Sequence, residues 1–404
     1  MTDVQQASKR LDGGDPKTAG TPDRAGLSSG HVMWMSIAAG VSVANVYYLQ
    51  PLLRPLATSF GVSDALVGLL PMITMVGYAT GLLLVVPVLE RSGLHRLMRW
   101  LNAGRLIALA LAASATGYPV FAAASVLLGA TSVLAQILMP AAASLAPREA
   151  VGRTTARITA GLFGGIVGAR VIAGALDGLV GWRSVYVLSA LMTLVVHLAL
   201  RRLPEPPVRH GLSYRALMAS LLPLLRSERG LRRAALTAAA GFAAFNVFWT
   251  AVTLYVTGPA HNWSTAGAGL LGLVGVIGTA TVLAISRFLD RGMQRGLAVA
   301  AAGVMALGLL IAGPWGSSAG ALIVGALLLD SGARVSNVAN QTQALRQRPE
   351  ARARLNTLYM TAYFAAGSVG SAAGALLFAH AGWTLAALVA AALATLGAAL
   401  AARA

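Results

Sequence analysis

The chain has 404 residues, of which 57% are hydrophobic and only 11% are charged. Soluble domains carry about 25% charged residues, so this composition excludes a water-soluble globular protein and indicates a chain solvated largely by lipid. The net charge of +18 could indicate a nucleic-acid partner. Its distribution along the chain, described below, indicates membrane topology instead.

Residues 1–31 are polar and basic, and we expect them to form a flexible cytosolic tail. Apolar stretches follow, each near the roughly 20 residues that a membrane-spanning helix needs. Twelve such stretches lie near residues 32–55, 65–88, 98–117, 119–145, 157–178, 183–202, 234–257, 264–287, 296–313, 319–341, 356–378 and 384–403. The sequence therefore predicts an all-α integral membrane protein with twelve transmembrane helices.

All but five of the 31 Lys and Arg residues lie in the two termini and in loops on one side of this arrangement. The exceptions are Arg54 and Arg183 on the other side, and Arg105, Arg170 and Arg334 inside predicted spans. Because basic loops stay in the cytoplasm, both termini are expected there. The basic surplus is thus a topology signal, and we expect no nucleic-acid partner.

Short motifs recur at an offset of 200 or 201 residues, each at the equivalent place in a six-helix unit. The matching pairs are Asn45–Tyr48 with Asn246–Trp249, Glu90–Arg91 with Asp290–Arg291, and Gly181–Trp182 with Gly382–Trp383. We therefore predict two pseudo-symmetric six-helix bundles, 32–202 and 234–404. A basic cytosolic linker, 203–233, joins them.

The loop Val86–Arg96 resembles the signature loop between helices 2 and 3 of the major facilitator superfamily, and Asp290–Arg295 is its second-half copy. Ala44–Leu53 and Asn356–Gly370 resemble bacterial members of the drug:proton antiporter branch. The resemblance implies the major facilitator fold and a multi-pass transporter in a bacterial inner membrane. It also implies alternating access about a midplane site and proton-coupled export of small amphipathic compounds.

The same resemblance gives Glu90, Arg91, Asp290 and Arg291 the role of a gating latch that holds the outward-facing state. The arginines can also be read as ordinary topology charges. Helices 1, 4, 7 and 10 line the central cavity in this superfamily.

Asp330 is the one acidic residue of the chain predicted to lie at mid-membrane. Arg334, Asn337 and Gln341 follow it on the same helical face, so this stripe should line a cavity or a packed interface. Asp330 and Arg334 could form a proton-coupling pair, or a permanent salt bridge that holds the helix in place.

Arg170 could bind an anionic substrate group, pair with a carboxylate of another helix, or snorkel towards the outer surface. Arg105 is expected to snorkel. The remaining predicted cavity residues are polar or aromatic, and each can also be read as an interhelical hydrogen bond. They are Asn45, Tyr48, Gln136, Asn246, Trp249, Asn356, Tyr359 and Tyr363.

Three glycine pairs, Gly161/Gly165, Gly164/Gly168 and Gly370/Gly374, have the spacing of close helix contacts. Gly267–Gly272 matches a dinucleotide fingerprint, but it lies in an apolar helix and indicates packing.

The chain has no cysteine, and its histidines lack metal-ligand spacing, so we expect no metal, no cofactor and no enzyme activity. The expected partners are a small-molecule substrate, protons and the lipid bilayer, with the protein as a monomer. Uptake of a polar or anionic metabolite is the main alternative to export. An integral-membrane enzyme or sensor is a lesser one.

Overall fold

The computed structural model describes residues 27–88, 92–206, 213–348 and 351–403, and within them the chain forms helices and no strand. The α-helices are α2 (Ser29–Tyr47), α3 (Leu49–Phe60), α4 (Asp64–Val67), α5 (Leu69–Leu84), α7 (Leu94–Ser114), α8 (Tyr118–Thr131), α9 (Leu134–Leu145), α10 (Val151–Val180), α11 (Arg183–Ala199), α12 (Tyr214–Ser227), α13 (Arg229–Val256), α14 (Thr265–Leu270), α15 (Val274–Asp290), α16 (Gln294–Ala312), α17 (Ala319–Leu345) and α18 (Arg352–Ala402).

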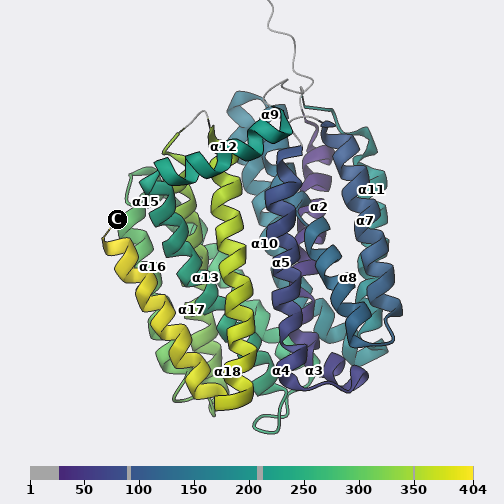
Figure 1. Cartoon of the computed structure of the whole chain (residues 1–404), viewed down its shortest axis with the longest axis vertical. Helices are drawn as coiled ribbons and strands as arrows, with labels where there is room; N and C mark the ends of the chain where they lie inside the picture. The colour runs from purple at the N-terminus through teal and green to yellow at the C-terminus, as the bar shows by residue number, and fades with distance from the viewer. Residues whose placement is uncertain (1–26, 89–91, 207–212, 349–350, 404) are drawn as a thin grey trace, which may run out of the picture.

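Nine of the described helices are long and apolar enough to cross a membrane, or ten if the bent pair α2–α3 counts as one span. The predicted span 98–117 corresponds to α7, which is not among them and carries Arg96, Arg99 and Arg105. The last two predicted spans are the limbs of α18, a 51-residue helix that turns back at Gly382 (Figure 1). The count of twelve spans remains a prediction.

Several spans are interrupted between their ends. The first is bent by 42° between α2 and α3, at Tyr48. Another breaks between α8 and α9, where Ser132 and Val133 leave the helical conformation. A 3-10 turn, Leu271–Leu273, joins α14 to α15. Such breaks free backbone groups that must find other partners in a membrane, and they occur where a span lines a site.

The repeated Gly-Trp motif adopts the same backbone conformation in both places. Gly181 has φ of 87° and Gly382 has φ of 78°, a region that favours glycine. The following tryptophans are both buried and both donate from Nε1, Trp182 to Ser59 Oγ and Trp383 to the carbonyl of Ala312, each at 2.9 Å. This equivalence agrees with a duplicated six-helix unit, although the boundaries of the halves stay a prediction.

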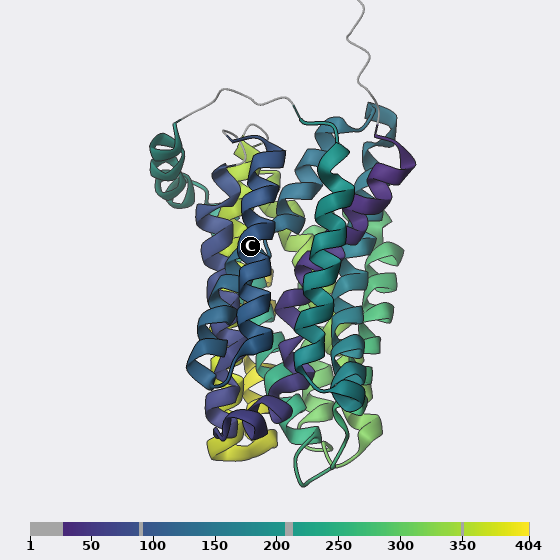
Figure 2. The same cartoon turned by 90° about the vertical axis from the view of Figure 1, so that its right-hand side faces the viewer.

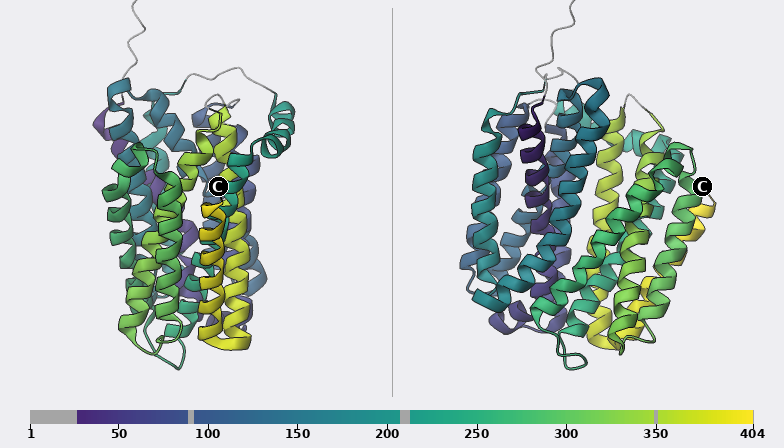
Figure 3. Two further views of the ribbon diagram at one scale, coloured as in Figure 1. Left: turned by 90° about the vertical axis from the view of Figure 1, so that its left-hand side faces the viewer. Right: turned by 180° about the vertical axis from the view of Figure 1, so that it is seen from behind.

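The long helices run roughly alongside one another, and α12 lies across one end of the bundle (Figures 1 and 2). Helix α4 lies at the opposite end (Figure 1). Seen from behind, the first and second parts of the chain form two groups of helices side by side (Figure 3).

Contacts between the two predicted halves are concentrated between the middle of the bundle and the α4 end. A Cβ on Gly68, at the start of α5, would collide with Ala375 of α18. Nearer the middle, the rings of Tyr78 and Phe364 lie 4.3 Å apart. On the other side of the contact, a Cβ on Gly174 of α10 would lie 2.5 Å from the carbonyl oxygen of Thr265 in α14. The halves are therefore packed together towards the α4 end.

Candidate functional site

The polar stripe of α17 begins with a buried ion pair. Asp330 is 0% exposed and Arg334, one turn later, is 8% exposed. Nε of Arg334 donates to Oδ2 of Asp330 at 2.5 Å. The i, i+4 spacing that motivated the prediction brings the two groups together on one face of the helix.

Arg170 of α10 reaches the same carboxylate from the other predicted half. Its Nη1 lies 3.9 Å from Oδ1 of Asp330, and its Nε donates to the Gln50 side-chain oxygen of α3 at 2.6 Å. Arg170 is 1% exposed, so the structure does not place it at the outer surface. Asp330 thus lies between two guanidinium groups and touches both halves.

Glycines of α14 and α15 allow these helices to lie directly on the charged cluster. A Cβ on Gly272 would lie 2.7 Å from Cδ of Arg170, and one on Gly275 would lie 2.8 Å from Nη2 of Arg334. A Cβ on Gly278 would collide with Oδ2 of Asp330. Gly272 closes the string that resembled a dinucleotide fingerprint, and its role here is close packing.

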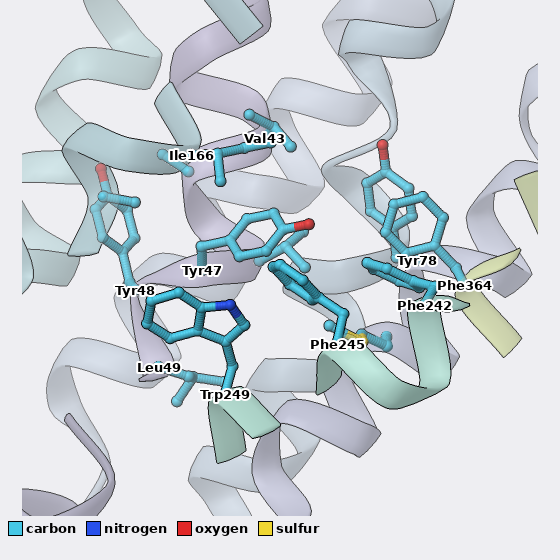
Figure 4. Packing of buried hydrophobic residues seen from close by; sticks show 14 of the residues in the cluster. Val43, Tyr47, Tyr48, Leu49, Tyr78, Ile166, Phe242, Phe245, Trp249 and Phe364 are labelled. Carbon is cyan, nitrogen blue, oxygen red and sulfur yellow. The ribbon is translucent and has the colours of Figure 1, made fainter. Parts of the chain in front are cut away.

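Aromatic rings surround the two guanidinium groups. The Cζ of Arg170 lies 3.8 Å from the ring centroid of Trp249, 5.4 Å from that of Tyr47 and 5.7 Å from that of Phe245. These rings lie together in Figure 4, whereas the Tyr48 side chain points away from them. Phe163 lies 4.6 Å from Cζ of Arg334. Cation–π attraction therefore offsets part of the cost of burying the charges.

Two asparagines predicted to line the cavity instead bond within their own halves. Asn45 Oδ1 accepts from Ser189 of α11 at 2.8 Å. Asn246 Nδ2 donates to the carbonyl of Phe242 at 2.8 Å, and its Oδ1 accepts from Ser371 of α18 at 3.5 Å. Both asparagines are 0% exposed, so in this conformation the interhelical alternative describes them, and their role in a cavity stays a prediction.

Further along the stripe, α17 bonds to α18. The Tyr359 hydroxyl donates to Oδ1 of Asn337 at 3.0 Å, and Gln341 donates to Oδ1 of Asn356 at 2.8 Å. These four residues therefore form interhelical hydrogen bonds, which was the alternative to lining the cavity. The ring of Tyr363 stacks on that of Phe242, with centroids 3.8 Å apart.

Exposure along the stripe rises towards the end of the bundle that carries α12. Asp330 is fully buried, Arg334 retains 8% exposure, and Asn337 and Gln341 are half-buried. Gln136, at the start of α9, is 9% exposed. The charged cluster is thus the most buried part of the stripe.

Arg105 is 0% exposed, so the expectation that it snorkels was wrong. Its Nη2 donates to Ser42 Oγ at 2.9 Å and to the carbonyl of Thr131 at 2.7 Å. Ser42 Oγ in turn donates to the carbonyl of Ser132 at 2.6 Å. The carbonyls at the end of a helix lack partners within that helix and need other donors. Arg105 points inwards because it supplies such a donor at the break between α8 and α9.

Of the predicted latch, Glu90 and Arg91 and the side chain of Asp290 lie outside the described part of the chain, and Arg291 is exposed.

Two of the three predicted glycine pairs make close contacts with another helix. Gly161 and Gly165 pack against Ser36 and Gly40 of α2, and Gly370 and Gly374 pack against α13. Gly164 and Gly168 have no such contact.

A membrane-embedded bundle with a charged cluster at the contact between two repeats is typical of a secondary transporter. The model of the Major Facilitator Superfamily matches residues 35–347, and the chain belongs to this family. It is 36% identical over 361 residues to the uncharacterized transporter YgaY of Escherichia coli O157:H7, covering 88% of this chain and 91% of that relative.

Two solved structures share the fold. The nucleoside transporter NupG has a TM-score of 0.75 at 13% identity, covering 92% of this chain and 99% of its own. The human organic anion transporter MFSD10 has a TM-score of 0.72 at 18% identity, with coverages of 93% and 100%. The predictions of an all-helical major facilitator fold and of a transporter rather than an enzyme are confirmed. The antiporter branch, the direction of transport and proton coupling stay predictions.

Four residues of the cluster were missed by the sequence predictions: Gln50, Tyr47, Phe245 and Phe163. Gln50 carried a usable signal, because an amide inside an apolar span needs a partner. Tyr48 was predicted at the site in place of its neighbour Tyr47. The bend between α2 and α3 changes which of these two adjacent side chains faces the cluster. The two phenylalanines carry no distinguishing signal in a chain this apolar.

Proposed function

We propose that this chain is a proton-coupled transporter of small amphipathic compounds in which Asp330 carries the coupled proton. The observation that carries the proposal is the position of Asp330. It is the one buried carboxylate among the described residues, and it contacts α10 of one predicted half from α17 of the other.

The coupling follows from the charges at this contact. While Asp330 is ionised, it attracts Arg170 and Arg334 and favours the packed arrangement. Protonation removes that attraction, so separating α10 from α17 costs less. A proton bound with different affinity in two conformations shifts the balance between them, as alternating access requires.

We include the remaining predictions in this proposal. The halves 32–202 and 234–404 rock about the cluster, and Glu90, Arg91, Asp290 and Arg291 act as the latch. With both termini in the cytoplasm of a bacterial cell, the packed α4 end faces outwards, so the structure corresponds to an inward-facing state. The direction depends on how proton and substrate affect each other: export, implied by the antiporter resemblance, requires that they compete, and uptake requires that they bind together.

The protonation of Asp330 can be tested without knowing the substrate. The purified full-length protein is titrated from alkaline to acidic pH while its infrared difference spectrum is recorded. We expect a protonated-carboxyl band that disappears in Asp330→Asn and persists in the control Asp177→Asn, whose carboxylate is half-buried on α10. A wild-type band that survives in Asp330→Asn would place the proton on another group.

A further inference from the structure

Arg170 has donors without acceptors. Its Nη1 and Nη2 make no hydrogen bond although the residue is 1% exposed. The contact of Nη1 with Asp330, at 3.9 Å, is too long for a hydrogen bond, and the nearest ring, that of Trp249, offers no acceptor atom. A buried guanidinium with unused donors is costly, and it is suited to a planar two-oxygen anion.

The buried charges do not balance. Among the described residues, Arg105, Arg170 and Arg334 are buried together with a single carboxylate, that of Asp330. Arg105 has the carbonyl of Thr131 as a permanent partner. At the cluster itself, two guanidinium groups therefore share one carboxylate, which leaves one positive charge in surplus when Asp330 is ionised.

We propose that Arg170 binds the carboxylate of an amphipathic substrate, with the flat apolar part of that substrate against Trp249, Tyr47 and Phe245. The anion supplies both the missing acceptors and the missing charge. The rings supply apolar and stacking surface beside it. This inference rests on the proposed function, since it assigns the substrate class of the same transporter.

The site also determines whether proton and substrate bind together or compete. The substrate carboxylate and ionised Asp330 compete for Arg170, so protonation of Asp330 favours substrate binding. Within the described part of the chain, the other charged or titratable groups near Asp330 are Arg334 on its own helix, Tyr47 of α2 and Tyr363 of α18. From α15, Gly275 and Gly278 face it. Proton and substrate therefore bind together, as in uptake driven by an inward proton gradient, and this favours the uptake alternative over export.

Direct binding to the purified full-length protein in detergent tests the assignment. The probes are benzoate, cinnamate and indole-3-carboxylate, each compared with its neutral carboxamide. We expect at least one carboxylate to bind about 10- to 150-fold more tightly than its amide, the range for a hydrogen bond to a charged group. We expect its affinity to rise as the pH falls, and this rise to be lost in Asp330→Asn. Equal binding of all acids and amides, or no binding of any acid, would overturn the proposal.

Substitutions of Arg170 test whether this residue binds the carboxylate. Arg170→Gln should remove the preference for the acid, and Arg170→Lys should reduce it, because a lysine keeps the charge without the planar fork. The control Arg153→Gln changes an exposed arginine of the same helix and should keep the full preference. If Arg170→Gln does not fold, Arg170→Lys decides, since an unchanged preference there would contradict the assignment.

The two proposals can fail separately. Binding in detergent needs no proton gradient, so the absence of an acid preference in the wild-type protein would overturn the anion site and leave the proton role of Asp330 standing. An infrared band that survives in Asp330→Asn would overturn the proton role of Asp330 and leave the anion site at Arg170 standing.

Discussion

Nη2 of Arg105 in α7 lies 2.7 Å from the carbonyl oxygen of Thr131, the last residue of α8. This bond satisfies the backbone at the break between α8 and α9. Arg105 thereby holds a discontinuous span in one conformation. Its buried charge has a structural role that is separate from the charges of the central cluster.

Arg105→Ala should therefore lower the thermal stability of the purified protein. Loss of a charge-assisted hydrogen bond that leaves a buried carbonyl unpaired costs about 1.5–3 kcal/mol. The measurement is the unfolding midpoint in detergent, with Arg105→Lys expected to recover part of it. Arg99→Ala, an exposed change on the same helix, is the control. Equal midpoints for Arg105→Ala and the control would contradict this role.

Gly278→Ala should disturb the cluster, because the added Cβ would collide with Oδ2 of Asp330 and lie 3.1 Å from Nε of Arg334. Overpacking of this kind costs about 1–3 kcal/mol. We expect a lower unfolding midpoint and reduced transport. Gly303→Ala on α16 meets no atom within 4 Å and should match or exceed the wild-type midpoint. A Gly278→Ala protein as stable and active as Gly303→Ala would show that α15 does not press on the site.

The contact between α5 and α18 provides a test of rocking. Sδ of Met75 lies 3.9 Å from Oγ of Ser371, and these helices belong to different predicted halves. In a chain without cysteine, Met75→Cys with Ser371→Cys can be joined by a short bifunctional methanethiosulfonate, which forms a disulfide with each thiol. Joining them should stop transport, and cleavage by a reductant should restore it. Each single cysteine variant treated in the same way is the control. Undiminished transport in the cross-linked protein would exclude separation of the halves at this contact.

Topology can be measured with single cysteines at two exposed positions, Ser213 at the start of α12 and Ser317 before α17. In intact cells an impermeant maleimide should label Ser317→Cys and leave Ser213→Cys unlabelled, while both should react after the cells are opened. Labelling of position 213 from outside would reverse the orientation and the assignment of the inward-facing state.

Hydropathy predicted the helical bundle, because bilayer thickness sets the length of each span. The pairing of Asp330 with Arg334 was also accessible, since local helical periodicity sets it. The approach of Arg170 to Asp330 was not, because it joins residues far apart in the sequence, and only the packing of α10 and α17 specifies which charges meet.

The error at Arg105 has a physical origin that also applies to Asn45. Both were interpreted from their position along a span, whereas their partners are set by tertiary contacts, at a helix break for Arg105 and within one half for Asn45. Buried polar groups in a membrane bond to whatever donor or acceptor packs beside them. Sequence periodicity indicates that such a residue faces protein, and the packing decides which helix it faces.

The most direct test of the central proposal compares two transport modes in proteoliposomes for any solute that the wild-type protein exchanges. Asp330→Asn should retain counterflow, which needs no net proton movement, and should lose accumulation driven by a pH gradient. Asp177→Asn should retain both. Accumulation by Asp330→Asn under a pH gradient would contradict the account and leave the buried ion pairs with a structural role alone.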